Sequence, residues 1–109
     1  MEFRKVTAII NRSALEKVEE ALQAAGVPGI SVTRVKGFGE YADFFQSDWT
    51  STHARIEVFT SIQYADSIAR TIMEAAYTGL EGDGLIAILP VEKLYRIRTR
   101  ALMDPELAC

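Results

Sequence analysis

The chain has 109 residues and a formal net charge of −3, and this length suits a single domain over residues 1–109. The acidic balance counts against a nucleic-acid-binding protein, because such proteins usually carry a basic face. The sequence has no apolar run of the roughly 18 residues that a membrane-spanning helix needs, no signal-peptide pattern at its start and only one cysteine, so we expect a cytoplasmic protein without disulfides.

The first third of the chain predicts two strands with a helix between them. Residues 3–10 are rich in Val and Ile, with apolar residues at alternate positions, which is typical of a strand. Ser13 and Glu16 have the spacing of a capping box at the start of a helix. Apolar residues at helical spacing follow until Gly26, where we expect the helix to end. A second strand is predicted over residues 30–37.

The rest of the chain predicts a long loop, two further strands, a second helix and a short final strand. Residues 40–52 show no periodicity, so we expect a loop there. Residues 55–60 alternate polar and apolar side chains, which predicts a strand, and residues 62–75 have the apolar spacing of an amphipathic helix. The apolar run 85–89 predicts a fourth strand, and residues 94–98 predict a short final strand.

The predicted order of elements is βαββαβ with a short extra strand, followed by a C-terminal tail over residues 100–109. We therefore predict an α+β fold of the ferredoxin-like kind, in which two helices cover one face of a four-stranded antiparallel sheet. The other face would carry Thr and charged residues as well as Ile and Val. A half-apolar face of this kind indicates burial against another copy of the chain.

Three interpretations compete for the segment Lys36–Gly37–Phe38–Gly39. It is similar to the start of an RNP1 motif, but Glu40 stands where that motif needs an aromatic residue, and the segment ends strand two instead of lying on strand three. The two glycines could also simply let the strand bend into the loop. The third interpretation is a phosphate-binding segment, which a second glycine-rich stretch supports.

That second stretch, Gly79–Gly84, joins the second helix to the fourth strand and contains three glycines in six residues. A helix end followed by a turn would explain one or two of them, and the third suggests a backbone that something approaches closely. Arg96 and Arg98 are two residues apart on a predicted strand, so they would project to one face, where an anion could lie between them. The alternative is an edge strand whose charges oppose aggregation.

The predicted loop 40–52 contains four aromatic residues, namely Tyr41, Phe44, Phe45 and Trp49. They could fold back on the protein as a local cluster. They could also form a docking loop that buries its aromatic side chains against a partner protein.

The sequence offers no metal site and no catalytic site that we can identify. His53 is the only histidine, and no cysteine or second histidine lies at ligand spacing from it. Cys109 is expected to be a free thiol. Because no arrangement of a nucleophile with a base or of paired carboxylates is recognisable, we predict that the chain is not an enzyme, although weak nucleotide hydrolysis stays open.

From about Lys5 to Thr99 the chain resembles the nitrogen-regulatory PII signalling family, with the opening strand, both helices and the three motif segments in family order. The resemblance implies a homotrimer that binds adenine nucleotide in the clefts between neighbouring subunits. It implies these nucleotide-binding residues: Ser31, Gly37, Phe38, Gly39, Glu57, Phe59, Gly82, Asp83, Gly84, Arg96 and Arg98.

The resemblance also implies a role for most of these residues. Ser31 matches a hydroxyl residue near the adenine, and Glu57 and Phe59 match positions that line the base pocket. The turn Gly82–Gly84 matches the family's phosphate cradle, and the two arginines match residues that pair with phosphates. Gly37 and Gly39 match the glycines at the base of the family's large loop.

The chain departs from the family pattern at three positions. Tyr41 replaces a glutamine that helps to hold magnesium and 2-oxoglutarate, Leu85 replaces a lysine that reaches the terminal phosphates, and His53 replaces a lysine beside the loop. These departures predict that ADP or AMP binds at least as tightly as ATP and that the 2-oxoglutarate response is lost. The tyrosine-bearing loop sequence that is modified in the nitrogen-control proteins has no match either.

We therefore interpret the chain as a divergent PII-like protein linked to inorganic carbon, of the branch found near bicarbonate transporters or carboxysome components. Bicarbonate or another small anion could join the nucleotide. The expected partner is a membrane transporter or its regulator, bound through residues 40–52. The alternatives are a true nitrogen-regulatory PII protein and a metal-binding trimer similar to the CutA copper-tolerance proteins.

Overall fold

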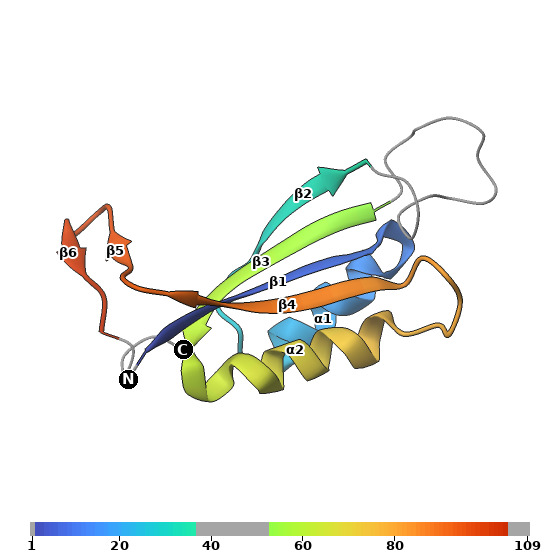
Figure 1. The fold of residues 1–109 in the computed structure, drawn as a ribbon, viewed down its shortest axis with the longest axis horizontal. Coiled ribbons are helices and arrows are strands. Elements are labelled where there is room, and N and C mark those ends of the chain that lie inside the picture. The colour runs from blue at the N-terminus through green and yellow to red at the C-terminus, as the bar shows by residue number, and fades with distance from the viewer. Residues whose placement is uncertain (1, 37–52, 105–109) are drawn as a thin grey trace.

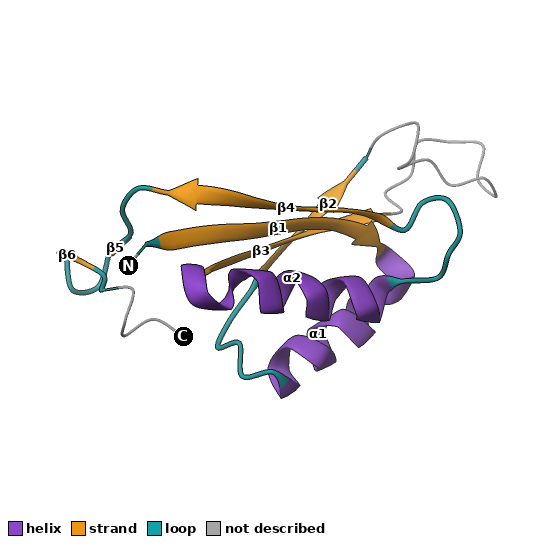
Figure 2. Ribbon diagram, turned by 60° about the horizontal axis from the view of Figure 1, so that its bottom comes forward, coloured by secondary structure: helices purple, strands orange, loops and turns teal. Residues whose placement is uncertain are grey.

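A computed structural model describes residues 2–36 and 53–104 of the chain (Figure 1). A four-stranded antiparallel sheet of order β2-β3-β1-β4 lies on two helices, and a separate two-stranded hairpin lies beyond one end of the sheet (Figures 1 and 2). The elements are β1 (Phe3–Asn11), the short 3-10 helix η1 (Arg12–Ala14), α1 (Leu15–Ala24), β2 (Ser31–Val35), β3 (His53–Ser61), α2 (Ile62–Ala76), β4 (Gly84–Val91), β5 (Tyr95–Arg96) and β6 (Ala101–Leu102). The predicted ferredoxin-like α+β fold is confirmed.

The core lies between the sheet and the two helices, which both cover the same face (Figure 2). In the central strands every second side chain points into this layer, so the pair Val6 and Val58 and the pair Ala8 and Ile56 are buried. The helices bury their apolar stripes against them, with these residues inside: Val18 and Leu22 from α1, and Ala65, Ile68, Ala69, Ile72 and Ala76 from α2.

The other face of the sheet is open in the single chain and is half apolar, as predicted. It carries a salt bridge of 3.0 Å between Lys5 and Glu57. Phe59, which is opposite Lys5 in the register, is 54% exposed, and Leu85, which is opposite Ile9, is 48% exposed. Exposed apolar side chains that gather on one face often mark an interaction surface, so we still expect another copy to cover this face.

The predicted capping box at Ser13 and Glu16 is wrong. β1 continues to Asn11, whose side-chain oxygen accepts hydrogen bonds from the Ser13 N–H at 2.9 Å and from the Ser13 hydroxyl at 2.8 Å. The Ser13 side chain is therefore engaged with Asn11, and the one-turn η1 precedes α1. The N-cap residue of α1 is Ala14, which has no side chain that could cap the helix.

The predicted final strand over residues 94–98 is also wrong in its second half. β5 ends at Arg96, and residues 97–100 form a turn that leads into β6. The Arg100 N–H closes this turn by donating to the Arg96 carbonyl at 2.8 Å. Arg98 therefore lies in the turn, and the prediction that both arginines project from one strand does not hold.

Among residues 2–36 and 53–104, no helix is long and apolar enough to cross a membrane.

Candidate functional site

The glycine-rich stretch forms a turn from Thr78 to Gly84, which we call the glycine turn, between the end of α2 and the start of β4 (Figure 1). The Asp83 carboxylate holds this turn together from within. It accepts hydrogen bonds from the backbone N–H groups of Thr78 and Gly79, both at 2.9 Å, and from the Thr78 hydroxyl. Asp83 therefore satisfies N–H groups that follow the last helical turn and fixes the path of the chain into β4.

These hydrogen bonds keep the Asp83 side chain charged. Hydrogen bonds from the Thr78 hydroxyl and from the backbone N–H groups of Thr78 and Gly79 hold the pKa of the Asp83 carboxyl below its ordinary value. Because the carboxylate is already bound to its own chain, its role in the turn is to position the backbone.

Gly84 is required by the packing of the chain itself. Its φ is +99°, and a Cβ at this position would overlap the Ile9 carbonyl oxygen and lie 2.8 Å from the Ile9 carbonyl carbon. The sequence predicts a close approach to this backbone, and at Gly84 strand β1 makes such an approach. Gly82 also has a positive φ, of +93°, which favours glycine.

His53 makes a contact with the glycine turn that the sequence analysis missed. Its side chain is buried, with 1% of its surface exposed, and its Nε2 lies 2.8 Å from the Gly82 carbonyl oxygen. A carbonyl only accepts, so Nε2–H donates. His53 begins β3 while Gly82 precedes β4, and β1 lies between these strands in the sheet. The two residues are 29 positions apart, so no local pattern in the sequence indicates the contact.

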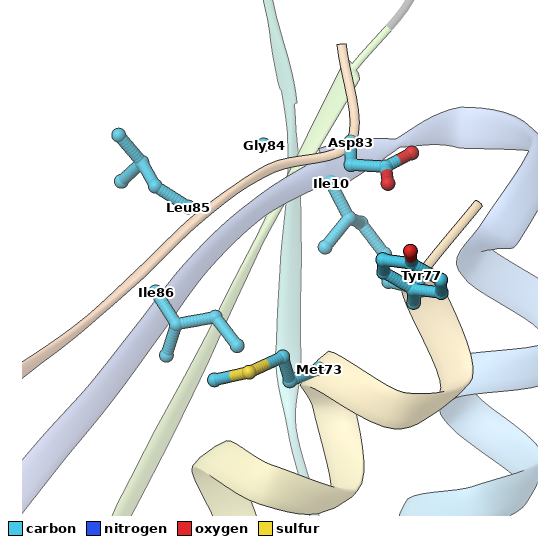
Figure 3. A pocket seen from close by; sticks show the side chains of 8 residues that line it. Ile10, Met73, Tyr77, Asp83, Gly84, Leu85 and Ile86 are labelled. Carbon is cyan, nitrogen blue, oxygen red and sulfur yellow. The ribbon is translucent and has the colours of Figure 1, made fainter. Parts of the chain in front are cut away.

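A cavity of about 270 Å³ lies between α2 and the start of β4 (Figure 3). Met73 and Ile86 point toward each other across it, and Leu85 points away from α2 (Figure 3). The residues that line the cavity are Ile10, Met73, Ala76, Tyr77, Asp83, Gly84, Leu85 and Ile86. The cavity is mostly apolar, and no motif in the sequence predicts it. Only Asp83 and Gly84 in its lining are predicted site residues.

The predicted site residues fall into separate groups in the single chain. The glycine turn lies at the start of β4, and the hairpin with Arg96 and Arg98 lies beyond its other end (Figure 1). The eight residues of β4 alone span about 26 Å. One chain therefore does not bring its arginines to its own glycine turn.

The remaining predicted residues are on the sheet or outside the described part. Ser31 and Glu57 are opposite each other on β2 and β3, and the Glu57 carboxylate is bound by Lys5 at 3.0 Å. Phe59 lies on the open face, two residues along from Glu57. Gly37, Phe38 and Gly39 lie outside the described residues, as do Tyr41 and the other loop aromatics.

Both arginines of the hairpin are exposed. Within residues 2–36 and 53–104, neither guanidinium pairs with a carboxylate. In the same part of the chain, no group of three or more His, Cys, Asp or Glu side chains is placed to hold a metal ion.

The family model of nitrogen regulatory protein P-II matches residues 3–101. The chain belongs to the P-II family. It is 40% identical over 104 residues to the nitrogen regulatory protein P-II of Cereibacter sphaeroides, and 37% identical over 104 residues to the nitrogen regulatory protein GlnK of Escherichia coli K12. Each of these alignments covers 89% of this chain and 93% of the relative.

The fold comparison agrees. A crystal structure of Arabidopsis thaliana PII bound to citrate matches with a TM-score of 0.81 and 33% identity, over 94% of this chain and 90% of that one. Membership of a family of signalling proteins confirms that this chain is a regulator and not an enzyme. The relatives are nitrogen regulatory proteins, which favours the nitrogen-regulatory alternative over the divergent bicarbonate-linked branch and over the CutA-like alternative.

Proposed function

We propose that this protein is a nitrogen-regulatory P-II signalling protein that binds adenine nucleotide and regulates a partner protein. The glycine turn is the observation that supports nucleotide binding. Asp83 and Gly84 hold this stretch of backbone in one conformation. Successive backbone N–H groups in such a turn suit phosphate oxygens. The exposed guanidinium groups of Arg96 and Arg98 suit the same oxygens, because their planar donors match them.

The proposal includes a homotrimer, because the turn and the arginines are at opposite ends of β4. If the hairpin of one copy reaches the glycine turn of the next, the contact is head-to-tail, and three such contacts can close a ring. Two observations support this arrangement. The hairpin presents Ile97 at 92% exposure and Tyr95 at 62% exposure, and the open sheet face presents Phe59. Apolar groups of this size favour burial against another copy.

The choice of nucleotide is the finer part of the proposal. Leu85 follows the glycine turn directly and carries no charge, at a position where the family has a lysine that reaches the terminal phosphates. A missing charge-assisted hydrogen bond weakens the contact to a terminal phosphate by about 1.5–3 kcal/mol. We therefore propose that ADP or AMP binds at least as tightly as ATP and that 2-oxoglutarate adds nothing to the affinity. A role for bicarbonate has no support from the relatives.

The partner protein is proposed to bind through residues 40–52, which lie outside the described residues. Four aromatic residues in that stretch, Tyr41, Phe44, Phe45 and Trp49, support a docking role, because aromatic side chains carry much of the binding energy at protein interfaces. A membrane transporter or its regulator remains our proposed partner, and the cytoplasm our proposed location.

Calorimetric titration tests the nucleotide proposal. Replacing both Arg96 and Arg98 by Ala should weaken ADP binding by roughly two orders of magnitude, because two charge-assisted contacts are lost. Arg70→Ala, which removes an exposed arginine of α2, should leave the affinity unchanged.

Three outcomes of the same titrations would count against parts of the proposal. A wild-type protein that binds no adenine nucleotide would refute it. Unchanged ADP affinity in the double variant would remove the arginines from the site. Strong preference for ATP, tightened by 2-oxoglutarate with magnesium, would refute the proposed choice of nucleotide.

A further inference from the structure

We infer that His53 is a positioning residue, which orients one backbone N–H of the glycine turn for a phosphate group. This inference rests on the proposed function, and it concerns a side chain that the family resemblance does not explain, because His53 stands where the family has a lysine. The contact that carries it is the hydrogen bond of 2.8 Å from Nε2–H of His53 to the Gly82 carbonyl oxygen.

This hydrogen bond is buried. His53 is 1% exposed and Gly82 is buried. A buried carbonyl without a donor is unfavourable, so the Gly82 carbonyl is held toward the imidazole more firmly than an exposed carbonyl would be.

The restraint on the Gly82 carbonyl also orients the N–H group of the next residue. The Gly82 carbonyl and the Asp83 N–H belong to one planar trans peptide, so they point in opposite directions. Holding the carbonyl toward His53 therefore holds the Asp83 N–H toward the opposite side of this peptide. This N–H is one of the donors that the glycine turn can offer to a phosphate.

His53 also opposes rotation of this peptide. Rotation of the Gly82–Asp83 peptide changes ψ of Gly82 and φ of Asp83 together, and glycine and aspartate are among the residues that best tolerate such changes. This rotation would exchange the positions of the Gly82 carbonyl and the Asp83 N–H. A carbonyl oxygen, which repels a phosphate, would then point to the side where the N–H was. The Asp83 carboxylate fixes the start of the turn by binding the N–H groups of Thr78 and Gly79. His53 fixes the Gly82–Asp83 peptide by donating to the Gly82 carbonyl.

His53→Leu and His53→Gln form the test pair, because leucine cannot donate and glutamine offers an amide N–H of similar reach. In the protein without nucleotide, hydrogen exchange over residues 82–84 should be faster in His53→Leu than in the wild type, and His53→Gln should restore slow exchange. ADP affinity, measured by calorimetry, should fall about tenfold in His53→Leu, and His53→Gln should recover most of it. Thermal unfolding midpoints establish that both variants are folded.

A measurement on the wild type keeps the test independent of the variants. Long-range proton–nitrogen NMR should detect a proton on Nε2 of His53, and an unprotonated Nε2 would overturn the inference. Unchanged exchange over residues 82–84 in a folded His53→Leu variant would overturn it too, as would unchanged ADP affinity in that variant. If exchange responds to His53 as expected and the wild type binds no ADP, the hydrogen bond orders the turn and the proposed function is what has failed.

Discussion

The glycine turn and the β5–β6 hairpin lie at opposite ends of β4 (Figure 1), and they are stabilised in different ways. The turn is held by its own Asp83 carboxylate and by two other parts of the chain. The Asp83 carboxylate binds the N–H groups of Thr78 and Gly79 within the turn, Gly84 lies against Ile9 of β1, and the Gly82 carbonyl accepts from His53 of β3.

The hairpin has far less support from its own chain. Its strands β5 and β6 pair over two residues each, and its apolar side chains Tyr95, Ile97 and Leu102 are exposed. A two-stranded hairpin of this size is marginally stable by itself. The geometry of the turn is therefore determined within one chain, whereas the hairpin has little support from its own chain and would be held in the proposed trimer by a contact with another copy.

Replacing Gly84 by Ala should have the largest effect on stability and is the strongest test of the turn. The new Cβ would overlap the Ile9 carbonyl and would also sit at a φ of +99°. We expect the free energy of unfolding to fall by about 3 kcal/mol or more, because the clash with backbone adds to the strain at positive φ. Chemical denaturation at a fixed protein concentration measures this change.

Two other glycines serve as controls that separate the cost of the clash with Ile9 from the cost of a positive φ. Gly26 has a φ of +88° with open space around its Cβ position, so Gly26→Ala should cost only the conformational strain, about 1–2 kcal/mol. Gly29 has neither a positive φ nor a close neighbour, and Gly29→Ala should be near neutral. If Gly84→Ala costs no more than Gly26→Ala, the close approach of β1 does not constrain the turn.

Removing the Asp83 carboxylate should have a moderate effect. Asp83→Ala leaves the N–H groups of Thr78 and Gly79 without this acceptor, and we expect a loss of about 1 kcal/mol, since solvent screens part of the interaction. Asp83→Asn keeps one acceptor oxygen and should lose less. Denaturation curves of the three proteins at neutral pH give the comparison.

The same carboxylate makes a prediction about pH. The pKa of Asp83 is lower in the folded state than in the unfolded chain, so the unfolded state binds the proton first as the pH falls. The contribution of Asp83 is fully present above the ordinary aspartate pKa of about 3.9 and is lost as the pH falls through the lower folded value. Asp83→Asn should flatten this part of the stability profile, and an unchanged profile would show that the hydrogen bonds to Thr78 and Gly79 do not hold the charged form.

The sequence predicts the larger elements of the fold well, because β1, β3 and α2 have clear periods and β4 contains a short apolar run. β1 and β3 alternate apolar residues, and α2 repeats them at helical spacing, so burial decides both structures. The hairpin could not be predicted in the same way, because strands of two residues have no period. The capping box failed because the Ser13 hydroxyl donates to the side-chain oxygen of Asn11, a contact that the spacing of Ser13 and Glu16 does not indicate.

The candidate site is predictable only where its signal is local. The Gly79–Gly84 stretch identifies the turn, because all three of its glycines have a positive φ, a conformation that favours glycine. Its contact with His53 joins strands that are not neighbours in the sheet. In the proposed trimer, the grouping of Arg96 and Arg98 with the turn depends on a second copy of the chain. Sequence periodicity carries no information about this grouping or about the His53 contact.

Ile97→Ser should have the smallest effect on the stability of a single chain. It tests whether the hairpin is held by a contact with another copy. Ile97 is 92% exposed in the hairpin, so polar replacement should change the folding free energy of one chain by less than about 0.5 kcal/mol. In the proposed trimer the same side chain is buried against a neighbour, where an isoleucine contributes about 2 kcal/mol. Light scattering over a dilution series should therefore show the variant dissociating at higher concentration than the wild type.

Tyr64→Ser, which removes an exposed apolar residue of α2, is the matched control and should dissociate like the wild type. A wild-type protein that is monomeric at micromolar concentration would refute the trimer itself, whereas equal dissociation of wild type and Ile97→Ser would place the interface elsewhere and leave the hairpin without the contact that we infer.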